Sequence, residues 1–278
     1  MLQADSDEIV ILKQNYLGRS MAGRGNSWTI SRPNPSASVR LFCFPFAGGS
    51  ANYFHQWAIA LEPHVEVCAL SLPGRGARIK EAPYQHMQQV IAELEVSTPG
   101  LLDKPAIFFG HSMGAWVAYE LSSRLKVQPA HLIVSAADPG LRRKVAPVHL
   151  MNDKDLIEEL KVLGGTPDEI LENLEFFSQF FPMIRADFKM LETHCMLSRM
   201  PLPIGASIWS GARDPRVSPA LAYGWTHKFC SEVKHNTFRG GHMFINPDES
   251  GPACLTEIQR IVSTLALSEK DSPVAFTQ

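Results

Sequence analysis

The chain has 278 residues, of which 45% are hydrophobic, and its formal net charge is −2. This suits one large α/β domain. The absence of a basic stripe argues against nucleic acid as a partner, and no apolar run approaches the ~20 residues of a membrane span. The acidic N-terminus lacks the plan of a secretory signal. The 5 scattered cysteines, none in a C-x-x-C pair, favour a reduced, cytoplasmic protein.

Residues 1–38 are predicted to form a peripheral, partly flexible leader, because residues 20–35 are rich in Gly, Ser, Arg, Asn and Pro. Residues 28–30 fit a short edge strand. From residue 39 onward, apolar runs typical of strands alternate with helical patterns. Strands are expected at 39–44, 65–70, 106–109, 131–135, 206–210 and 232–238, and helices at 52–61, 87–95, from 115, around 220–226 and at 253–267. This alternation predicts a mostly parallel sheet with helices on both faces, followed by a polar tail at 268–278.

The alternation stops between about residues 138 and 200, where no strand pattern occurs. Asn152 is a candidate cap for a first helix, and residues 166–169 form a capping box that would open a second one. Phe177 and Phe181 lie on the apolar face of that second helix. We interpret the segment as an all-helical lid over the sheet edge, with these two phenylalanines facing the substrate. The alternative is an ordinary pair of core helices whose apolar faces only pack.

The stretch Gly110-His111-Ser112-Met113-Gly114 fits the nucleophile-elbow pattern G-x-S-x-G. An apolar strand precedes it and a helix follows, which is the context that the pattern requires. At such a turn the serine backbone is strained and the hydroxyl is lifted clear of the sheet. Gly110 and Gly114 leave room for the turn, and the backbone N–H of Met113 points toward developing negative charge. Ser112 is therefore the candidate nucleophile.

A serine nucleophile needs a general base, which in turn needs an orienting carboxylate. In hydrolases of this kind the acid precedes the histidine along the chain. Asp214 follows the strand at 206–210, and His242 follows the strand that ends at residue 238. Both lie just past the carboxyl end of a strand, where ligands bind in open α/β sheets.

Other residues compete for these two roles. Asp138 is the rival acid, since it follows the strand after the elbow, but it also opens the helical segment. His227 and His235 are the rival bases, although they lie at a helix end and within a strand. An Asp-Pro after a glycine is often only a turn, so the case for Asp214 and His242 depends on residue type, order and strand context together.

An oxyanion hole requires two N–H donors. Met113 supplies one, and the loop at residues 45–49, after the first core strand, is expected to supply the other from Ala47 or Phe46. The glycines of this loop let the backbone approach a substrate. A phosphate loop is the weaker reading because no G-K-[ST] follows. We expect no cofactor and no metal.

Several motifs together resemble the type II thioesterases of nonribosomal peptide and polyketide biosynthesis. They are Phe44-Pro45-Phe46-Ala47-Gly48-Gly49-Ser50, Leu72-Pro73-Gly74-Arg75, Phe109-Gly110-His111-Ser112-Met113-Gly114, Gly164-Gly165-Thr166, Arg185-Ala186-Asp187 and Gly240-Gly241-His242. The resemblance covers about residues 38–267. Many relatives carry His where Phe46 stands, and Phe or Tyr where Met243 stands. The resemblance implies an α/β-hydrolase fold and a monomer.

The implied activity is hydrolysis of aberrant or stalled acyl and aminoacyl thioesters on the phosphopantetheine arm of carrier proteins. Carrier proteins are usually acidic, so Arg142-Arg143-Lys144 could contact one, although a solvated loop is the simpler reading. Two alternatives keep the enzyme and change the substrate: a medium-chain fatty acyl thioesterase, whose family shares the motifs, or a carboxylesterase. A catalytically silent binding module is the alternative of another class.

Overall fold

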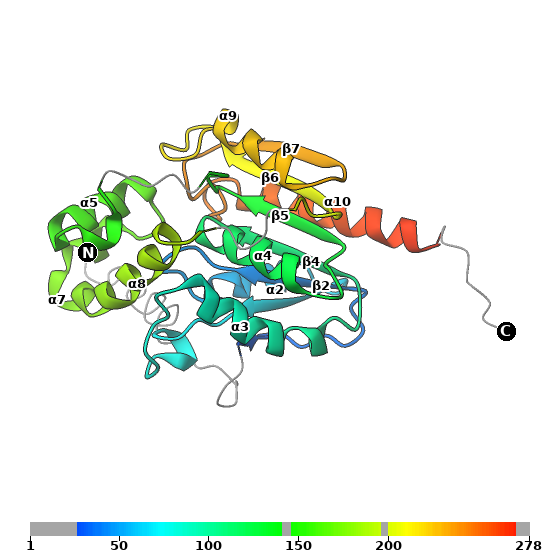
Figure 1. Cartoon of the computed structure of the whole chain (residues 1–278), viewed down its shortest axis with the longest axis horizontal. Helices are drawn as coiled ribbons and strands as arrows, with labels where there is room; N and C mark the ends of the chain where they lie inside the picture. The colour runs from blue at the N-terminus through cyan, green and yellow to red at the C-terminus, as the bar shows by residue number, and fades with distance from the viewer. Residues whose placement is uncertain (1–26, 141–145, 196–199, 271–278) are drawn as a thin grey trace, which may run out of the picture.

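The computed structural model describes residues 27–140, 146–195 and 200–270, and its centre is a seven-stranded sheet in the order β1-β3-β2-β4-β5-β6-β7 (Figure 1). The strands are β1 (Trp28–Thr29), β2 (Val39–Phe44), β3 (Val65–Leu70), β4 (Ala106–His111), β5 (His131–Ser135), β6 (Gly205–Gly211) and β7 (Val233–Phe238). β2 to β7 are parallel, and β1 pairs antiparallel with β3 at one edge. The mostly parallel sheet predicted from the sequence is confirmed.

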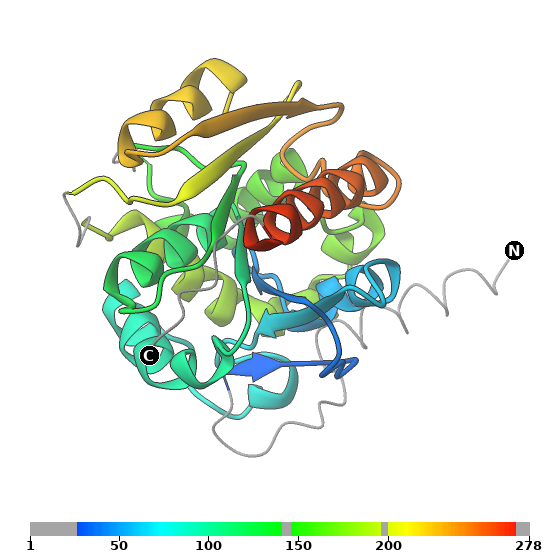
Figure 2. The ribbon, with the colours of Figure 1, turned by 90° about the vertical axis from the view of Figure 1, so that its right-hand side faces the viewer.

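Helices cover both faces of this sheet (Figure 2). α3 (Met87–Ser97), α4 (Met113–Arg124) and α9 (Pro219–Ala222) pack on one face, and α2 (His55–Ala60) and α10 (Gly251–Lys270) pack on the other. Neighbouring residues of β4 serve opposite faces: Phe108 packs toward α3 and α4, whereas Ile107 and Phe109 pack toward α2 and α10. This two-sided burial explains the nearly continuous apolar sequence of β4.

The body of the domain begins before residue 39. Trp28 in β1 is buried, its ring meets Phe42 and Phe44 edge-on, and its indole Nε1 donates to Thr98 Oγ1 at 3.3 Å. Trp28 and Thr29 therefore belong to the sheet rather than to a loose leader, because a buried aromatic side chain anchors them in the core. At the other end, α10 reaches Lys270, three residues beyond the predicted end. The remaining expectations for the leader and tail lie outside the described residues.

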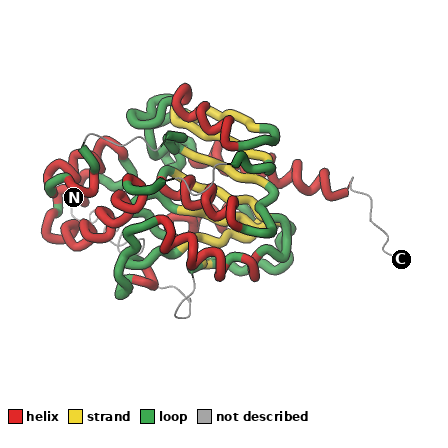
Figure 3. Tube along the Cα trace, in the orientation of Figure 1, coloured by secondary structure: helices red, strands yellow, loops and turns green. Residues whose placement is uncertain are grey.

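Residues 146–195 form an all-helical insertion between β5 and β6, at the left of Figures 1 and 3. It consists of α5 (Asp153–Leu163), α6 (Asp168–Glu172), α7 (Leu174–Phe177) and α8 (Phe181–Glu192), with short 3-10 turns at Val148–Leu150 and Ser178–Phe180. Residues 146–195 contain no strand, as the sequence predicted for this part of the chain. Below we call it the helical insertion, and the rest of the described chain the hydrolase body.

The first helix of the insertion begins where the sequence predicted, whereas the predicted second helix is not continuous. Asn152 caps α5 by accepting the Asp155 N–H at 3.0 Å. The predicted second helix is broken into α6, α7 and α8, and the expected capping box is absent, because α6 is capped by Pro167 without a side-chain hydrogen bond. Asn173, with φ −81° and ψ 76°, leaves the helical region and caps α7 instead. Pro182 is the second residue of α8, in the first turn, where the missing N–H of proline costs no helical hydrogen bond.

The insertion has a hydrophobic cluster of its own, separate from the two clusters on the sheet faces. Its centre is Phe177, which is fully buried, together with Phe180 and Phe181. The ring centre of Phe177 lies 6.0 Å from that of Phe180 and 5.6 Å from that of Phe181. The insertion is therefore a small packed unit seated on the body. Within the described residues, no helix is long and apolar enough to span a membrane.

Candidate active site

The elbow places Ser112 at a strained turn between β4 and α4. Its backbone has φ 53° and ψ −116°, a conformation that residues other than glycine adopt at a cost. Both flanking glycines are sterically required. A Cβ on Gly110 would lie 2.3 Å from the Gly114 carbonyl oxygen, and one on Gly114 would lie 2.0 Å from the Phe44 carbonyl oxygen. The turn thus exists only with bare backbone at these two positions, as the sequence predicted.

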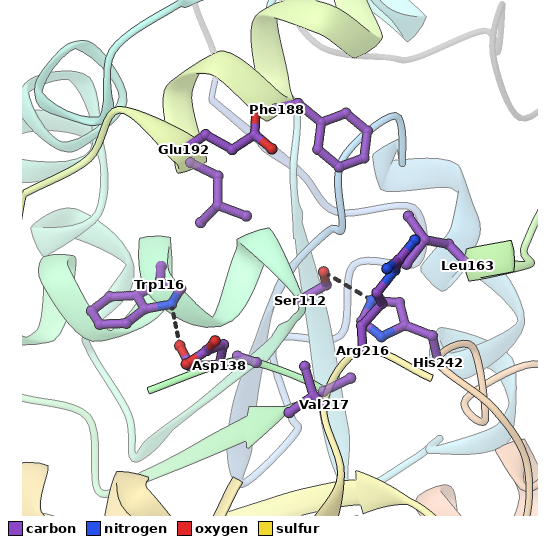
Figure 4. Close-up of a pocket in the computed structure, with 12 residues that line it drawn as sticks. Ser112, Trp116, Asp138, Leu163, Phe188, Glu192, Arg216, Val217 and His242 are labelled. Carbon is purple, nitrogen blue, oxygen red and sulfur yellow. Dashed lines mark hydrogen bonds between the residues drawn. The ribbon is translucent and has the colours of Figure 1, made fainter. Parts of the chain in front are cut away.

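Three side chains from distant parts of the chain, Ser112, His242 and Asp214, meet beside this turn. Figure 4 shows the bond between Ser112 and His242. His242 Nε2 lies 3.0 Å from Ser112 Oγ, and His242 Nδ1 lies 2.8 Å from Asp214 Oδ2. These are hydrogen-bond distances in the order nucleophile, base and orienting acid. His242 and Asp214 are 6% and 8% exposed, so water does not compete for the bond between them.

The Asp214 carboxylate is held on all sides. Its Oδ1 accepts the N–H groups of Arg216 at 2.8 Å and Val217 at 3.0 Å, while Oδ2 faces His242. Burial on its own would raise the pKa of Asp214, but the hydrogen bond and charge of His242 and the two N–H groups outweigh it and lower that pKa. The carboxyl group therefore stays ionised, which fixes the tautomer and orientation of the imidazole.

Two neighbouring strands deliver the acid and the base. β6 and β7 pair in parallel up to Gly211 and Phe238, and the loops that follow are joined by the Arg213 N–H, which donates to the Gly240 carbonyl at 2.9 Å. A Cβ on Gly211 would lie 2.1 Å from the Gly241 carbonyl oxygen, so the two loops touch backbone to backbone. The carboxyl ends of adjacent parallel strands thus bring Asp214 to His242.

The rival residues are engaged elsewhere. Asp138 Oδ1 accepts the Gly140 N–H at 2.7 Å, and its carbonyl accepts the Trp116 indole N–H at 3.0 Å. His235 stacks on Tyr223 at 4.5 Å and lies 3.0 Å from Thr226 Oγ1. His227 is exposed in the 3-10 helix Tyr223–Lys228. None of the three is the partner of Ser112.

His111, beside the nucleophile, points away from it into the core. Its Nδ1 lies 2.8 Å from Ser135 Oγ, and its ring centre is 5.5 Å from that of His242. Burial first, and the neighbouring His242 second, lower the pKa of His111 well below the usual value for histidine. The His111 side chain is therefore uncharged. When His242 takes a proton, no positive charge on His111 repels it.

The loop after β2 offers two N–H groups for an oxyanion. Pro45 has none, the Gly48 N–H donates to Asp187 Oδ2 at 2.8 Å, and the Gly49 N–H donates to the Phe46 carbonyl at 2.9 Å. Among the described residues, nothing accepts a hydrogen bond from the N–H of Phe46 or Ala47. Met113 is the first residue of α4, where the helix supplies no acceptor. The expected donors Met113, Ala47 and Phe46 thus remain available.

A cavity of about 150 Å³ opens on Ser112 and His242. The hydrolase body contributes Trp116 and Val217 to its wall, and the insertion contributes Leu163, Phe188, Leu191 and Glu192 (Figure 4). Phe177 and Phe181 are not among the described residues that line it. They are buried in the cluster of the insertion, so for these two side chains the structure matches the packing alternative.

Several wall residues escaped the sequence analysis. Glu192 accepts the Val148 N–H at 2.9 Å and lies 2.7 Å from His149 Nδ1, and Arg216 pairs with Glu159 of α5. Arg216 is only two residues from the predicted acid, so its place near the site could have been inferred. Nothing in the sequence marks Glu192, because its position depends on where the broken helix resumes as α8. No described group of three or more His, Cys, Asp or Glu residues could hold a metal.

A thioesterase domain family model matches residues 39–262, which is most of the chain. The chain belongs to the thioesterase family. This thioesterase is 32% identical over 226 residues to the gramicidin S biosynthesis protein GrsT of Aneurinibacillus migulanus, covering 79% of this chain and 88% of the relative. It is also 32% identical over 224 residues to the human medium-chain S-acyl fatty acid synthase thioesterase, covering 76% and 83% of the two chains.

A solved structure gives the same result for the fold. The type II thioesterase BorB from the borrelidin biosynthetic cluster superposes with a TM-score of 0.77 at 32% sequence identity, covering 84% of this chain and 97% of that one. The present thioesterase therefore has the α/β-hydrolase fold that the motifs implied, and it is a hydrolase of thioesters.

Proposed function

We propose that this thioesterase is an editing, type II enzyme, in which Ser112, His242 and Asp214 hydrolyse aberrant or stalled acyl and aminoacyl thioesters from the phosphopantetheine arm of a carrier protein. The observation that carries the proposal is the unbroken hydrogen-bond chain from Ser112 Oγ through His242 to Asp214 at the mouth of a cavity. The names of GrsT and BorB support the biosynthetic setting.

In the acylation step, Ser112 Oγ attacks the thioester carbonyl while His242 Nε2 takes its proton. The carbonyl oxygen becomes negative and is stabilised by the N–H groups of Met113 and of Ala47 or Phe46. Asp214 stabilises the imidazolium. The pantetheine thiol then leaves with the proton from His242. Its pKa of roughly 8.5 makes it a much better leaving group than an alcohol.

In the second step, His242 takes a proton from a water molecule, which attacks the acyl-serine. The same N–H groups hold the second oxyanion, and His242 returns the proton to Ser112 as the acid is released. Each step uses a proton that His242 already holds or can accept, so the reaction needs no cofactor.

The size of the cavity favours short acyl and aminoacyl groups. Its volume of about 150 Å³ is below the roughly 300–1,000 Å³ of pockets that hold drug-sized ligands. Trp116, Phe188 and Leu191 give it an apolar wall, so a short acyl chain would be desolvated there. A medium-chain fatty acyl group, as named for the human relative, would need the insertion to shift outward.

The partner in this proposal is an acyl- or peptidyl-carrier protein, and the enzyme works as a monomer in the cytoplasm. The basic segment Arg142-Arg143-Lys144, offered as a carrier contact, lies outside the described residues. Light scattering of the purified protein, alone and with a carrier protein, tests the monomer and the complex.

The decisive experiment is a panel of acyl-pantetheine thioesters and matched oxygen esters, assayed with the wild type and with Ser112→Ala. We expect kcat/KM for acetyl to butyryl and aminoacyl thioesters to exceed that for decanoyl thioesters and for oxygen esters. A many-fold preference for oxygen esters would instead indicate a carboxylesterase. A preference for decanoyl groups would indicate the fatty acyl alternative, and retained carrier binding without any turnover would indicate a binding module.

A further inference from the structure

Two motifs without a role in the reaction meet inside the protein. Arg75, in the loop after β3, and Asp187, on α8, are 112 residues apart and form a two-pronged ion pair. Arg75 Nη1 lies 2.6 Å from Asp187 Oδ2, and Nη2 lies 2.6 Å from Oδ1. The two side chains are 3% and 2% exposed. Removing two charges from water is expensive, and such pairs are weak evidence for a purely stabilising role.

The ion pair also holds the loop of the candidate oxyanion donors. Asp187 Oδ2 accepts the Gly48 N–H at 2.8 Å, and Arg75 Nη1 donates to the Gly49 carbonyl at 3.0 Å. Gly48 directly follows Ala47 and has φ +78°, so the chain turns there in a conformation that a side chain would strain. The peptides next to the free N–H groups of Phe46 and Ala47 are therefore fixed by two charged side chains.

The same contact joins the loop to the helical insertion. Ala47 packs against the hydrophobic cluster of the insertion and against one cluster of the hydrolase body. Ile184, one turn before Phe188 on α8, lies against Gly48, where an added Cβ would be 3.4 Å from its Cγ1. Arg185 donates to the carbonyl groups of His149 and Met151 and so ties α8 to the segment just before α5. α8 is thus bonded to the rest of the insertion on one side and to the loop after β2 on the other.

We propose that Arg75 and Asp187 are positioning residues, which hold the Phe46 and Ala47 N–H groups where the oxyanion forms. Because Asp187 is on α8, the position of these N–H groups then depends on the position of α8. The inference rests on the proposed function of Ser112, His242 and Asp214. Asp187 fixes the loop by accepting the Gly48 N–H. Arg75 neutralises the carboxylate, which would otherwise place a buried negative charge near the developing oxyanion.

The test compares Asp187→Leu, which removes the acceptor, with Asp187→Asn, which keeps an amide oxygen for the Gly48 N–H. For Asp187→Leu we expect kcat on a short acyl-pantetheine to fall about 100-fold, the loss typical of one oxyanion donor. KM should stay within about threefold, because the cavity wall is untouched. Asp187→Asn should recover about tenfold of the loss. The pH profile of kcat/KM should keep its shape, since His242 and Asp214 are unchanged.

A tetrahedral inhibitor reports on the oxyanion site directly. A trifluoromethyl ketone carrying a short acyl-like group adds to Ser112 and places its oxygen between the same N–H donors, so its inhibition constant should weaken in Asp187→Leu by the same factor as kcat. The matched control is Glu93→Leu, which breaks another two-pronged pair, between Arg78 and Glu93 of α3, neither of which lines the cavity. It should leave kcat and inhibitor binding unchanged.

The proposal is overturned if Asp187→Leu keeps the kcat of the wild type, if KM rises instead, or if inhibitor binding does not weaken. It is also overturned if Glu93→Leu loses as much activity. Should Asp187→Leu not fold, Asp187→Asn and Arg75→Lys carry the test. Each should lower kcat and inhibitor affinity in parallel. Wild-type kcat in both variants would reject the positioning role. Failure of the proposed function looks different, because then the wild type itself would not hydrolyse the thioester.

Discussion

The hydrolase body and the helical insertion are held together by different kinds of contact. In the body, one sheet carries an apolar cluster on each face, and the site residues follow from strand ends at one edge. In the insertion, short helices surround Phe177 in a cluster of their own. The body therefore fixes the reacting atoms, and the insertion supplies part of the wall around the acyl group.

Buried polar pairs cross the seam between the two regions. Besides the Arg75–Asp187 ion pair, His194 Nε2, two residues past α8, lies 2.8 Å from Glu120 Oε1 on α4, with both side chains fully buried. Such pairs are expensive to bury and tolerate little displacement, so they specify one relative position rather than merely adding adhesion. The comparison thus indicates that the hydrolase body governs the chemical steps. The helical insertion governs which acyl groups fit the cavity.

The largest effect should come from the nucleophile in the body. Ser112→Ala removes the attacking oxygen, and we expect kcat for acyl-pantetheine to fall on the order of 10⁵- to 10⁶-fold. Unfolding free energy should change by less than about 0.5 kcal/mol, since no packing is lost. Single-turnover kinetics and urea unfolding measure both. Ser263→Ala, exposed on α10, is the control and should match the wild type. Turnover surviving in Ser112→Ala would mean that the nucleophile is misassigned.

The second effect tests the orienting acid. Asp214→Asn keeps the size of the side chain but favours the wrong imidazole tautomer, so kcat should fall about 10⁴-fold. Asp138→Asn, the rival acid, should lose far less, because its carboxylate bonds to the Gly140 N–H rather than to His242. The measurement is kcat for both variants on one substrate. A greater loss in Asp138→Asn would reverse the assignment.

The two regions also differ in how well their sequences predicted them. Strand alternation and residue order were enough to place Ser112, Asp214 and His242 together, because parallel strands share one carboxyl edge. The path of the insertion could not be predicted in the same way. A break at Asn173 changes the direction of the chain, and periodicity does not reveal which helix face meets the cavity. Phe177 and Phe188 have the same residue type and similar burial, yet only Phe188 is among the described residues lining the cavity.

These two phenylalanines provide the third test. Phe177→Ala should lower the unfolding free energy by about 3–5 kcal/mol, as for other buried aromatic side chains. Its substrate preference should remain that of the wild type at temperatures where it is folded. Phe188→Ala should instead shift the ratio of kcat/KM for octanoyl over acetyl thioesters upward by about tenfold, since it enlarges the cavity. Denaturant unfolding and the acyl-chain panel measure both. A shifted chain preference in Phe177→Ala would show that the cluster and the cavity are not separate.

The smallest effect concerns the body alone and depends on pH. His131, at the start of β5, has a pKa lowered to about 4 by burial, with a smaller contribution from Lys234. An unfolded histidine binds a proton near pH 6.5, whereas this one stays neutral until about pH 4. The unfolded state therefore binds more protons in that window, and stability falls as the pH drops through it. Between pH 7 and pH 5 the loss from this residue should be about 2 kcal/mol. His131→Gln should remove that part of the slope in urea unfolding without changing kcat at pH 7. An unchanged slope would mean that protonated His131 is accommodated in the folded body.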